Sequence, residues 1–556
     1  MLCCAVIVFI ALTAASAASK DAEKCHSALD SSTTQPQSVA GMHFGAYNQQ
    51  LAVLGFMHHT YSDPGVQASL SVVPVGALRY PGGTPSNYFN LSNGMFVFPC
   101  KEPGEFDLCK SYDSVARWPV ETIGPKAFRG NLTTRILGGA APGNVAYVVN
   151  LLTLSGEELF GQVDSLIEGI GADNIQYIEL GNEYYLDKYD FKFPNGSSYG
   201  ALGVTVAKYI KQRLPHCKIS FVASFEFEPA GSGSDKLAEW NAQLGSSFGD
   251  EIDFVTIHDY RLHWAPHHTG MFKVDKKHQL QALPSEMLEL FIGWGPAMIP
   301  QFISNVETFY GECTKIFITE HDVSKGTEPA IGNSALRAMY AINYGIAAFC
   351  APNRSVQMSL LHILWGGVDG NVEADYTTVM LPNHNDPITA TYSTVAQILS
   401  HVTMLGLNLH QQATCMNFAS TSACGTPVVV NNASGVQCLH GITFWNSTEG
   451  SAGNDSFTAV VVNGCNEELH VELELPMPII HGRNVTVWTY PHYHTFGADA
   501  WVPFPGSSDC GGTLWNPVGS GCNASIVVPQ RFQRPVEIGQ SSFDVVLEPF
   551  SMKIIH

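Results

Sequence analysis

The chain has 556 residues, a length that exceeds one small domain and predicts one large domain plus a further one. Its formal net charge is −21, and only 14% of its residues are charged, against about 25% in an average soluble protein. Because a negative surface repels polyanions, nucleic acids and heavily sulfated polymers are disfavoured as partners at neutral pH.

An apolar run over residues 2–12 opens the sequence and is followed by small residues. Ala15-Ser16-Ala17 fits a signal-peptidase site, so residues 1–17 are predicted to be a signal peptide, although no Lys or Arg precedes the run. A membrane anchor is the alternative, but the run is too short to span a bilayer. We therefore expect a secreted protein without stable membrane insertion, with a lysosome or vacuole as the alternative destination.

From residue 41 to residue 405, short apolar runs alternate with longer stretches of helical pattern, which is typical of an α/β fold with a parallel sheet. The number of such runs favours a closed (β/α)8 TIM barrel. The expected strands are residues 41–46, 76–79, 145–151, 175–180, 218–223, 252–257, 315–319 and 356–364.

The pattern changes near Gly406. Residues 406–556 carry short alternating runs separated by turn residues, as in a β-sandwich. A strand from residues 28–40 could join that sandwich before the chain enters the barrel. The expected organisation is thus a barrel over residues 41–405 and a C-terminal β-sandwich domain over residues 406–556.

Cysteines and glycosylation sequons agree with secretion. The chain has fourteen cysteines, and loss of Cys3 and Cys4 with the signal peptide would leave twelve, an even number that suggests disulfides. No Cys-x-x-Cys or histidine spacing suggests a zinc site, so structural bridges are expected. Asn-x-Ser/Thr sequons predict a glycoprotein and begin at Asn90, Asn131, Asn195, Asn353, Asn432, Asn446, Asn454, Asn484 and Asn523.

Two of the expected strands are followed by a glutamate. Glu183 comes shortly after the strand at 175–180, and Glu320 directly after the strand at 315–319. In a barrel of parallel strands the active site lies at the C-terminal ends, so we expect both carboxylates at one mouth. One such glutamate could simply form an ion pair. Two fit cleavage of a glycosidic bond, in which one carboxyl protonates the leaving oxygen and the other attacks the sugar.

The segments around these glutamates resemble motifs of clan A retaining glycosidases. Within the clan they most resemble glycoside hydrolase family 79, the β-glucuronidase and heparanase family, on the stretches 178–183 and 317–320. The resemblance implies that Glu183 is the general acid/base and Glu320 the nucleophile. It also implies that Asn182 hydrogen-bonds the sugar 2-hydroxyl.

Two further stretches carry the same resemblance. Residues 78–84 are similar to the strand-two segment, in which Arg79 would keep the nucleophile ionised. Residues 254–260 resemble a His-Tyr-Tyr segment, with Asp259 where an aromatic residue is common. Tyr260 would orient Glu320, and His258 would line the acid/base side. The alternatives are an ordinary ion pair for Arg79 and a core histidine for His258.

Two more residues are candidate sugar contacts. Trp365, at the expected end of the eighth strand, could stack on a sugar ring, with an ordinary core position as the alternative. Asn150, near the end of the third strand, is a weaker candidate.

The sequence therefore predicts a secreted retaining glycosidase that needs no metal or organic cofactor. Its substrate would be an oligosaccharide, polysaccharide or glycoside that contains a uronic acid. A clan A arabinofuranosidase or endoglycanase is the alternative, because no cation or donor cluster for a uronic carboxylate is evident. A non-catalytic carbohydrate-binding protein is disfavoured by the intact glutamate pair with Asn182, Arg79 and Tyr260.

Overall fold

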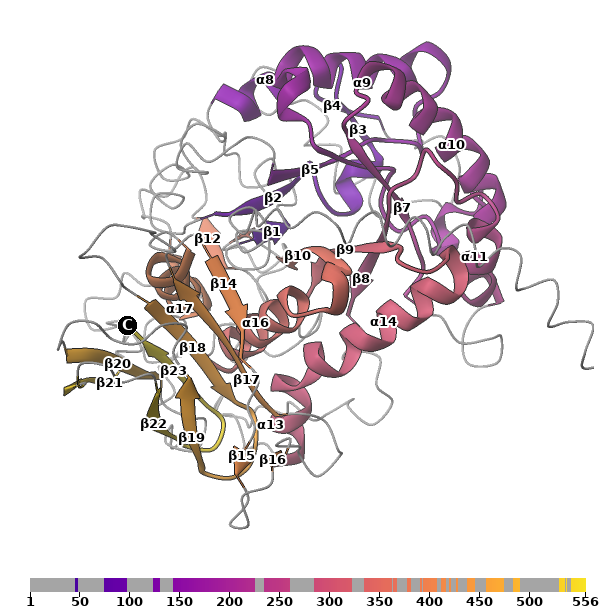
Figure 1. Cartoon of the computed structure of the whole chain (residues 1–556). Helices are drawn as coiled ribbons and strands as arrows, with labels where there is room; N and C mark the ends of the chain where they lie inside the picture. Colours follow the sequence, from indigo (N-terminus) through magenta and orange to yellow (C-terminus); the bar gives the residue numbers. More distant parts are fainter. Residues whose placement is uncertain are drawn as a thin grey trace, which may run out of the picture.

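The structure is a computed structural model and shows a barrel of parallel strands followed by a C-terminal group of antiparallel strands (Figure 1). The expected signal peptide and the expected strand at residues 28–40 lie outside the described residues. The structure describes residues 46–48, 75–97, 124–130, 144–225, 235–260, 285–322, 335–362, 364–367, 378–381, 391–392, 394–407, 412–416, 420–421, 427–428, 438–445, 457–474, 484–490, 530–535, 537 and 542–556.

The parallel strands close a barrel in the order β1-β10-β9-β8-β7-β6-β5-β2. Each overlaps one of the strands expected from the sequence, and the arrangement fits the expected (β/α)8 barrel. The strands are β1 (Ala46–Asn48), β2 (Ala77–Tyr80), β5 (Val145–Val148), β6 (Tyr177–Glu179), β7 (Lys218–Val222), β8 (Phe254–Asp259), β9 (Lys315–His321) and β10 (Val356–His362).

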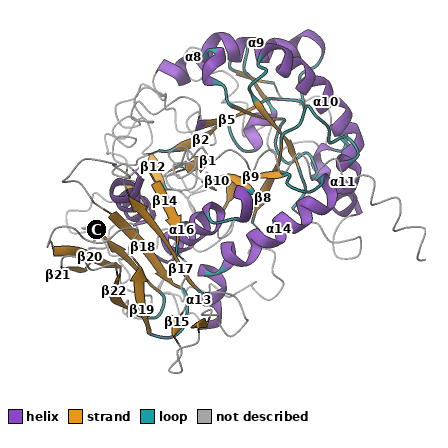
Figure 2. Cartoon of the chain, viewed as in Figure 1, coloured by secondary structure: helices purple, strands orange, loops and turns teal. Residues whose placement is uncertain are grey.

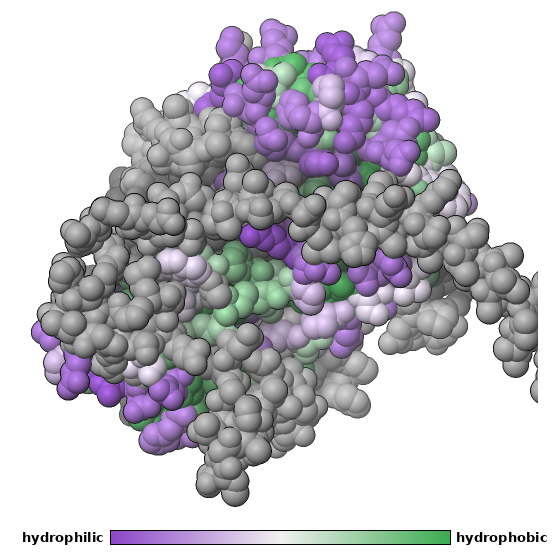
Figure 3. All heavy atoms as spheres, viewed as in Figure 1, coloured by the Kyte–Doolittle hydropathy of each residue, from purple (hydrophilic) through white to green (hydrophobic). Residues whose placement is uncertain are grey.

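Helices surround this barrel on its outside (Figure 2). In α9, for example, Leu159, Val163, Leu166 and Ile170 recur at helical spacing and are buried. Hydrophilic side chains gather on the outer faces of the helices at the top of the view (Figure 3). The helices are α8 (Pro125–Phe128), α9 (Gly156–Ile170), α10 (Gly196–Arg213), α11 (Asp235–Gly245), α13 (Ser285–Ile292), α14 (Trp294–Tyr310), α16 (Ala335–Phe349) and α17 (Thr394–Val402).

An aromatic layer fills the barrel axis. The rings of Phe254 and Phe317 stack with centroids 4.3 Å apart, and Tyr177 meets Phe317 edge-on at 5.3 Å. Side chains two positions further along a strand point the same way. Arg79 and Glu179 therefore face the axis one layer nearer the C-terminal ends, above this apolar floor.

A six-stranded antiparallel sheet forms much of the C-terminal region, in the order β14-β17-β18-β23-β20-β21. Its strands are β14 (Gln412–Cys415), β17 (Leu439–Trp445), β18 (Phe457–Asn463), β20 (Asn484–Tyr490), β21 (Gln530–Pro535) and β23 (Ser551–Ile555). A separate pair is formed by β19 (Leu469–Glu474) and β22 (Ser542–Leu547).

Strand β18 contributes to two hydrophobic cores. Val460 and Val462 belong to the main core, which also contains buried residues of α16 and α17. Ala459 and Val461, which face the other way, cluster with residues of β19 and β22. The region is therefore rich in sheet, as expected, while the complete β-sandwich and the domain boundaries stay predictions.

Smaller strands complete the described part of the chain. Strand β11 (Trp365–Gly367) pairs with β12 (Val379–Leu381), which pairs with β13 (Thr391–Tyr392). Two further pairs are β3 (Phe89–Asn90) with β4 (Met95–Phe96) and β15 (Ser420–Thr421) with β16 (Pro427–Val428). Among the described residues, no helix is long and apolar enough to cross a lipid bilayer.

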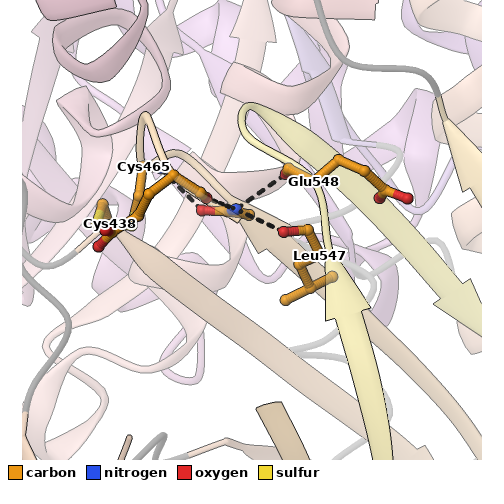
Figure 4. Close-up of a disulfide and its surroundings, with 6 residues drawn as sticks. Cys438, Cys465, Leu547 and Glu548 are labelled. Carbon is orange, nitrogen blue, oxygen red and sulfur yellow. Dashed lines mark hydrogen bonds between the residues drawn. A yellow bond between two sulfur atoms is a disulfide. The ribbon is translucent and has the colours of Figure 1, made fainter. Parts of the chain in front are cut away.

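Two disulfides join cysteines that are both among the described residues. Cys350 joins Cys415, and this bond links the end of α16 to β14. Cys438 joins Cys465 next to the carbonyl groups of Leu547 and Glu548 (Figure 4). The expectation of structural disulfides is confirmed for these two pairs.

Asn463 ties the turns beside the second disulfide together. Its side chain is fully buried, and its Nδ2 donates to the carbonyl oxygens of Glu467 at 2.9 Å, Glu548 at 2.9 Å and Leu547 at 3.2 Å. Its Oδ1 accepts the N–H of Cys465 at 2.9 Å. The amide thus forms hydrogen bonds with two backbone segments that are far apart in the sequence, residues 465–467 and residues 547–548.

We predict that Asn463→Asp lowers the free energy of unfolding by about 3 kcal/mol or more, because a buried carboxylate would face carbonyl oxygens to which it cannot donate. Urea unfolding followed by tryptophan fluorescence measures this. Thr205→Ala on the exposed face of α10 is the control and should stay within about 0.5 kcal/mol of the parent. An Asn463→Asp variant as stable as this control would contradict the capping role.

Candidate active site

The two glutamates expected to be catalytic lie together at the C-terminal end of the barrel. Glu320 lies near the end of β9, and Glu183 lies in the loop after β6. A carboxylate oxygen of each and a ring nitrogen of His258 all lie within 4.8 Å of one another. Glu320 is 4% exposed, whereas the side chain of Glu183 is 19% exposed, so Glu183 is the more accessible of the two.

A β-bulge in β9 turns Glu320 toward the barrel axis. Ile257 of β8 pairs with Ile318, but the next residue, His258, pairs with Glu320, so β9 has one extra residue at Thr319. A bulge re-aims the side chains that follow it. Thr319 and Glu320 consequently both contact polar groups inside the barrel, although they are adjacent in the strand.

The backbone of the loop that carries Glu183 is constrained. Gly181 has φ 99° and Glu183 has φ 50°, in the region that L side chains rarely adopt. A Cβ atom at position 181 would lie 2.0 Å from the ring of Tyr184, so only glycine fits. A non-glycine residue in such a conformation costs about 1–3 kcal/mol and persists only where its surroundings fix it.

Asn87 supplies part of that fixation. Its Nδ2 donates to the carbonyl oxygen of Asn182 at 2.7 Å, and the N–H of Asn182 donates to its Oδ1 at 2.9 Å. The side chain therefore pairs with the loop backbone as a neighbouring strand would. Tyr199 adds a second hold, since its hydroxyl donates to the carbonyl oxygen of Leu180 at 2.8 Å.

Arg79 is fully buried and lies at the centre of the polar layer. Its Nε and Nη2 donate to the two carboxylate oxygens of Glu179 at 2.6 and 2.8 Å. Its Nη1 donates to Glu320 Oε1 at 2.5 Å, and Nη2 also donates to Asn182 Oδ1 at 2.9 Å. Burial lowers the pKa of Arg79, but the charges of Glu179 and Glu320 outweigh this and raise it, so the group stays protonated.

The second oxygen of Glu320 faces a phenol and two imidazoles. Tyr260 donates its hydroxyl proton to Oε2 at 2.7 Å. The Nδ1 atoms of His258 and His362 each lie 3.7 Å from the same oxygen. Both oxygens of Glu320 are thus held in place, with the guanidinium on one side and Tyr260 on the other.

Glu183 has a different set of partners. His258 Nδ1 lies 3.0 Å from Oε1, and the other ring nitrogen of His258 lies 3.2 Å from the hydroxyl of Thr319. The hydroxyl of Tyr185 donates to Oε1 at 3.3 Å, and Asn182 Nδ2 donates to Oε2 at 3.4 Å. His258 therefore lies between the two glutamates and nearer to Glu183.

The charges around Glu183 act in opposite directions. Burial raises the pKa of its carboxyl group, but the hydrogen bond and the charge of His258 outweigh burial, with Lys188 and Arg79 adding to them. The net result is that the pKa of Glu183 is lowered to about 2. Burial and the charges of Glu183 and Glu320 raise the pKa of Tyr185, so its hydroxyl keeps its proton and stays a donor.

Two of the expected sugar contacts are placed differently. Strand β10 ends at His362, so Trp365 does not end the eighth barrel strand but belongs to the separate strand β11, which pairs with β12. Asn150 is fully buried in a turn, where its Nδ2 donates to Thr153 Oγ1 at 2.7 Å and its Oδ1 accepts two backbone N–H groups. With its amide engaged in this turn, Asn150 does not fit the expected substrate contact.

Asp259 also has a structural place. The strand alternation that points His258 inward points Asp259 outward, where it is buried. It accepts hydrogen bonds from Tyr344 at 2.8 Å and from the Trp294 indole at 3.2 Å, which lie in α16 and α14. The carboxylate at this position therefore joins the barrel to its outer helices.

Sequence reasoning missed four residues of the site. Tyr185 contacts Glu183, and His362 lies near Glu320. Glu179 binds Arg79, and Asn87 binds the backbone of Asn182. Glu179 had a detectable signal, because a charged residue within the apolar run 177–180 needs a buried partner. Asn87 and Tyr185 had none, since their contacts depend on how the loops fold.

The group Glu183, His258 and Glu320 could also offer ligands to a metal ion, since its ligand atoms are close together. Arg79 and Tyr260, however, already bind the two oxygens of Glu320, and the guanidinium charge opposes a nearby cation. The arrangement therefore suits proton transfer and nucleophilic attack better than metal binding.

We predict that Gly181→Ala destabilises the protein more than Gly311→Ala does. Both glycines have nearly the same φ, 99° and 98°, so both variants bear the backbone cost of about 1–3 kcal/mol. Only at Gly181 must a neighbouring ring move, which adds about 1–3 kcal/mol. Urea midpoints measure the difference; equal midpoints would show that the Tyr184 ring does not constrain this loop.

No protein-family model matches the sequence, and no curated protein matches it. Solved structures resemble it in fold. One is an arabinofuranosidase, with a TM-score of 0.57, 15% identity, and coverage of 94% of this chain and 97% of that one. Another is a family 51 α-L-arabinofuranosidase from Bifidobacterium longum, with a TM-score of 0.56, 14% identity, and coverage of 95% and 98%.

A third is a 4-O-α-L-rhamnosyl-β-D-glucuronidase from Fusarium oxysporum, with a TM-score of 0.51, 13% identity, and coverage of 93% and 96%. At such low identities the likeness is one of fold alone. It supports the expected clan A architecture, while family 79 stays a prediction. Over nearly its whole length, this chain has the fold of solved glycoside hydrolases.

Proposed function

We propose that the protein is a retaining glycosidase, with Glu183 as general acid/base and Glu320 as nucleophile. The observation that carries this proposal is the proximity of the two carboxyl groups, since one oxygen of Glu183 lies within 4.8 Å of one oxygen of Glu320. Retaining glycosidases hold these groups about 5–5.5 Å apart, whereas inverting enzymes leave about 6.5–9.5 Å for a water molecule. The distance favours direct attack by a carboxylate.

In the first step, an oxygen of Glu320 bonds to the anomeric carbon while the bond from that carbon to the leaving oxygen breaks. Glu183 gives its proton to the departing oxygen. In the second step, Glu183 takes a proton from water, and the resulting hydroxide displaces Glu320 from the sugar. Arg79 and Tyr260 hold the nucleophile at a fixed position throughout.

The mechanism needs a proton on Glu183, and the pKa of Glu183 depends on its contact with His258. The hydrogen bond and charge of His258 keep the Glu183 carboxyl ionised in the free enzyme. Burial already favours the neutral carboxyl, and a bound sugar that excludes water strengthens that effect. We therefore propose that substrate binding raises the pKa of Glu183, so that its carboxyl is protonated when the glycosidic bond breaks.

Glycosides and glycans that contain a uronic acid are the proposed substrates. The motif resemblance to family 79 supports this, and one similar structure is named as a β-D-glucuronidase. Arabinofuranosidase activity is the alternative, favoured by two similar structures of that name. Release of nitrophenol from a panel of nitrophenyl glucuronides, arabinofuranosides and glucosides separates the two.

We also propose that the protein is secreted and glycosylated. The apolar N-terminal run, the sequons and the two disulfides support this, because disulfides persist in oxidising compartments.

For the acid/base, we predict that Glu183→Ala slows glycosides with poor leaving groups at least about 100-fold more than dinitrophenyl glycosides, which need little proton assistance. Added azide should restore activity and yield a glycosyl azide with the substrate's anomeric configuration, because a small nucleophile can fill the space left by the carboxyl. Equal losses on both kinds of substrate, with no rescue, would remove Glu183 from this role.

For the nucleophile, we predict that Glu320→Gln reduces turnover at least about 10³-fold, because the amide has the same shape but cannot attack. A 2-deoxy-2-fluoro glycosyl inhibitor should label Glu320 in the parent, as judged by peptide mapping. Unfolding of Glu320→Gln by urea gives the control, with a midpoint close to the parent. Label on another residue would contradict the assignment.

A further inference from the structure

A lysine lies near the catalytic pair and is not used by the proposed mechanism. The loop after Glu183 forms the short 3-10 helix η5 (Asp187–Tyr189), at whose centre Lys188 is exposed. Its ammonium lies 4.9 Å from the centroid of the Tyr189 ring. Tyr189 is fully buried and packs edge-on against Tyr184, with centroids 5.7 Å apart. The ring therefore gives the ammonium a fixed neighbour.

Lys188 interacts electrostatically with both catalytic carboxylates. Surrounding protein desolvates the ammonium and lowers the pKa of Lys188, while the charges of Glu183 and Glu320 partly offset this. The ammonium is thus within electrostatic reach of both carboxylates.

The other cationic groups that act on Glu183 are already engaged. Arg79 is bonded to Glu179 and Glu320, and His258 contacts Glu183. Within the part of the chain that the structure describes, no salt bridge joins Lys188 to a carboxylate. Nearby Asp190 forms an ion pair with Lys236 instead, and Asp187 is exposed on the same turn.

We propose that Lys188 binds an anionic group, a carboxylate or a sulfate, on the glycan that lies across Glu183 and Glu320. This inference rests on the proposed glycosidase function and adds what selects the substrate. A carboxylate or sulfate there would form a charge-assisted hydrogen bond, whereas a hydroxymethyl group would leave the ammonium to water. In a chain of net charge −21, a local cation is needed to hold an anionic substrate.

The test compares kcat/KM for nitrophenyl β-D-glucuronide, β-D-glucoside and 6-sulfated β-D-glucoside. The three substrates share one sugar ring and differ at C6. The ratio of kcat/KM for a charged substrate to kcat/KM for the neutral glucoside therefore measures the effect of the charge. Lys188→Gln should lower that ratio at least tenfold, mainly through KM, and Lys188→Arg should retain most of it. The substrate whose ratio falls identifies the group as carboxylate or sulfate.

Lys208→Gln is the matched control. Lys208 is also an exposed lysine, but it lies on α10, and its ammonium is 3.6 Å from Glu251. It should leave the ratio unchanged. An unchanged ratio in Lys188→Gln would overturn the inference, as would an equal loss on all three substrates with a shifted pH profile, which would mean that Lys188 only tunes Glu183.

The outcomes also separate this inference from the function on which it rests. A parent enzyme that cleaves neutral glycosides or arabinofuranosides with no preference for charge overturns the role of Lys188 and leaves the glycosidase proposal intact. A parent enzyme that cleaves no glycoside overturns both.

Discussion

One buried guanidinium determines the geometry of the candidate site. Arg79 on β2 binds Glu179 on β6 through two hydrogen bonds, Glu320 on β9 through a third, and Asn182 through a fourth. A buried charge that loses its partner costs about 3–5 kcal/mol, so these groups depend on one another. Because Arg79 touches both Glu320 and the residue before Glu183, it holds the two carboxyl groups at the separation on which the proposed mechanism depends.

The apolar floor makes this polar layer possible. Phe254 and Phe317 fill the axis directly below Arg79 and Glu179, so water is excluded and the ion pairs act in a medium of low polarity. The same exclusion favours a neutral Glu183 once a sugar covers it. The site therefore combines Glu320, whose two oxygens are held by Arg79 and Tyr260, with Glu183, whose pKa depends on burial and on His258.

Sequence patterns were sufficient for the barrel and for the meeting of Glu183 and Glu320 at its C-terminal end, because strand spacing is local. Strict alternation from Phe317 would point Glu320 away from the axis, and only the bulge at Thr319 turns it inward. The pattern predicted an eighth strand that runs to residue 364, whereas β10 ends at His362, so Trp365 belongs to the separate strand β11. The contacts of Asn87 and Tyr185 could not be predicted, since they arise when loops distant in sequence meet.

The central claim is that Glu320 attacks the sugar directly while Glu183 handles the proton. Proton NMR of the reaction in its first minutes, before the released sugar mutarotates, tests this most directly. The account predicts that the first product has the same anomeric configuration as the substrate. A first product of the opposite configuration would show that water attacks in a single step, and would contradict the assignment of Glu320 as nucleophile.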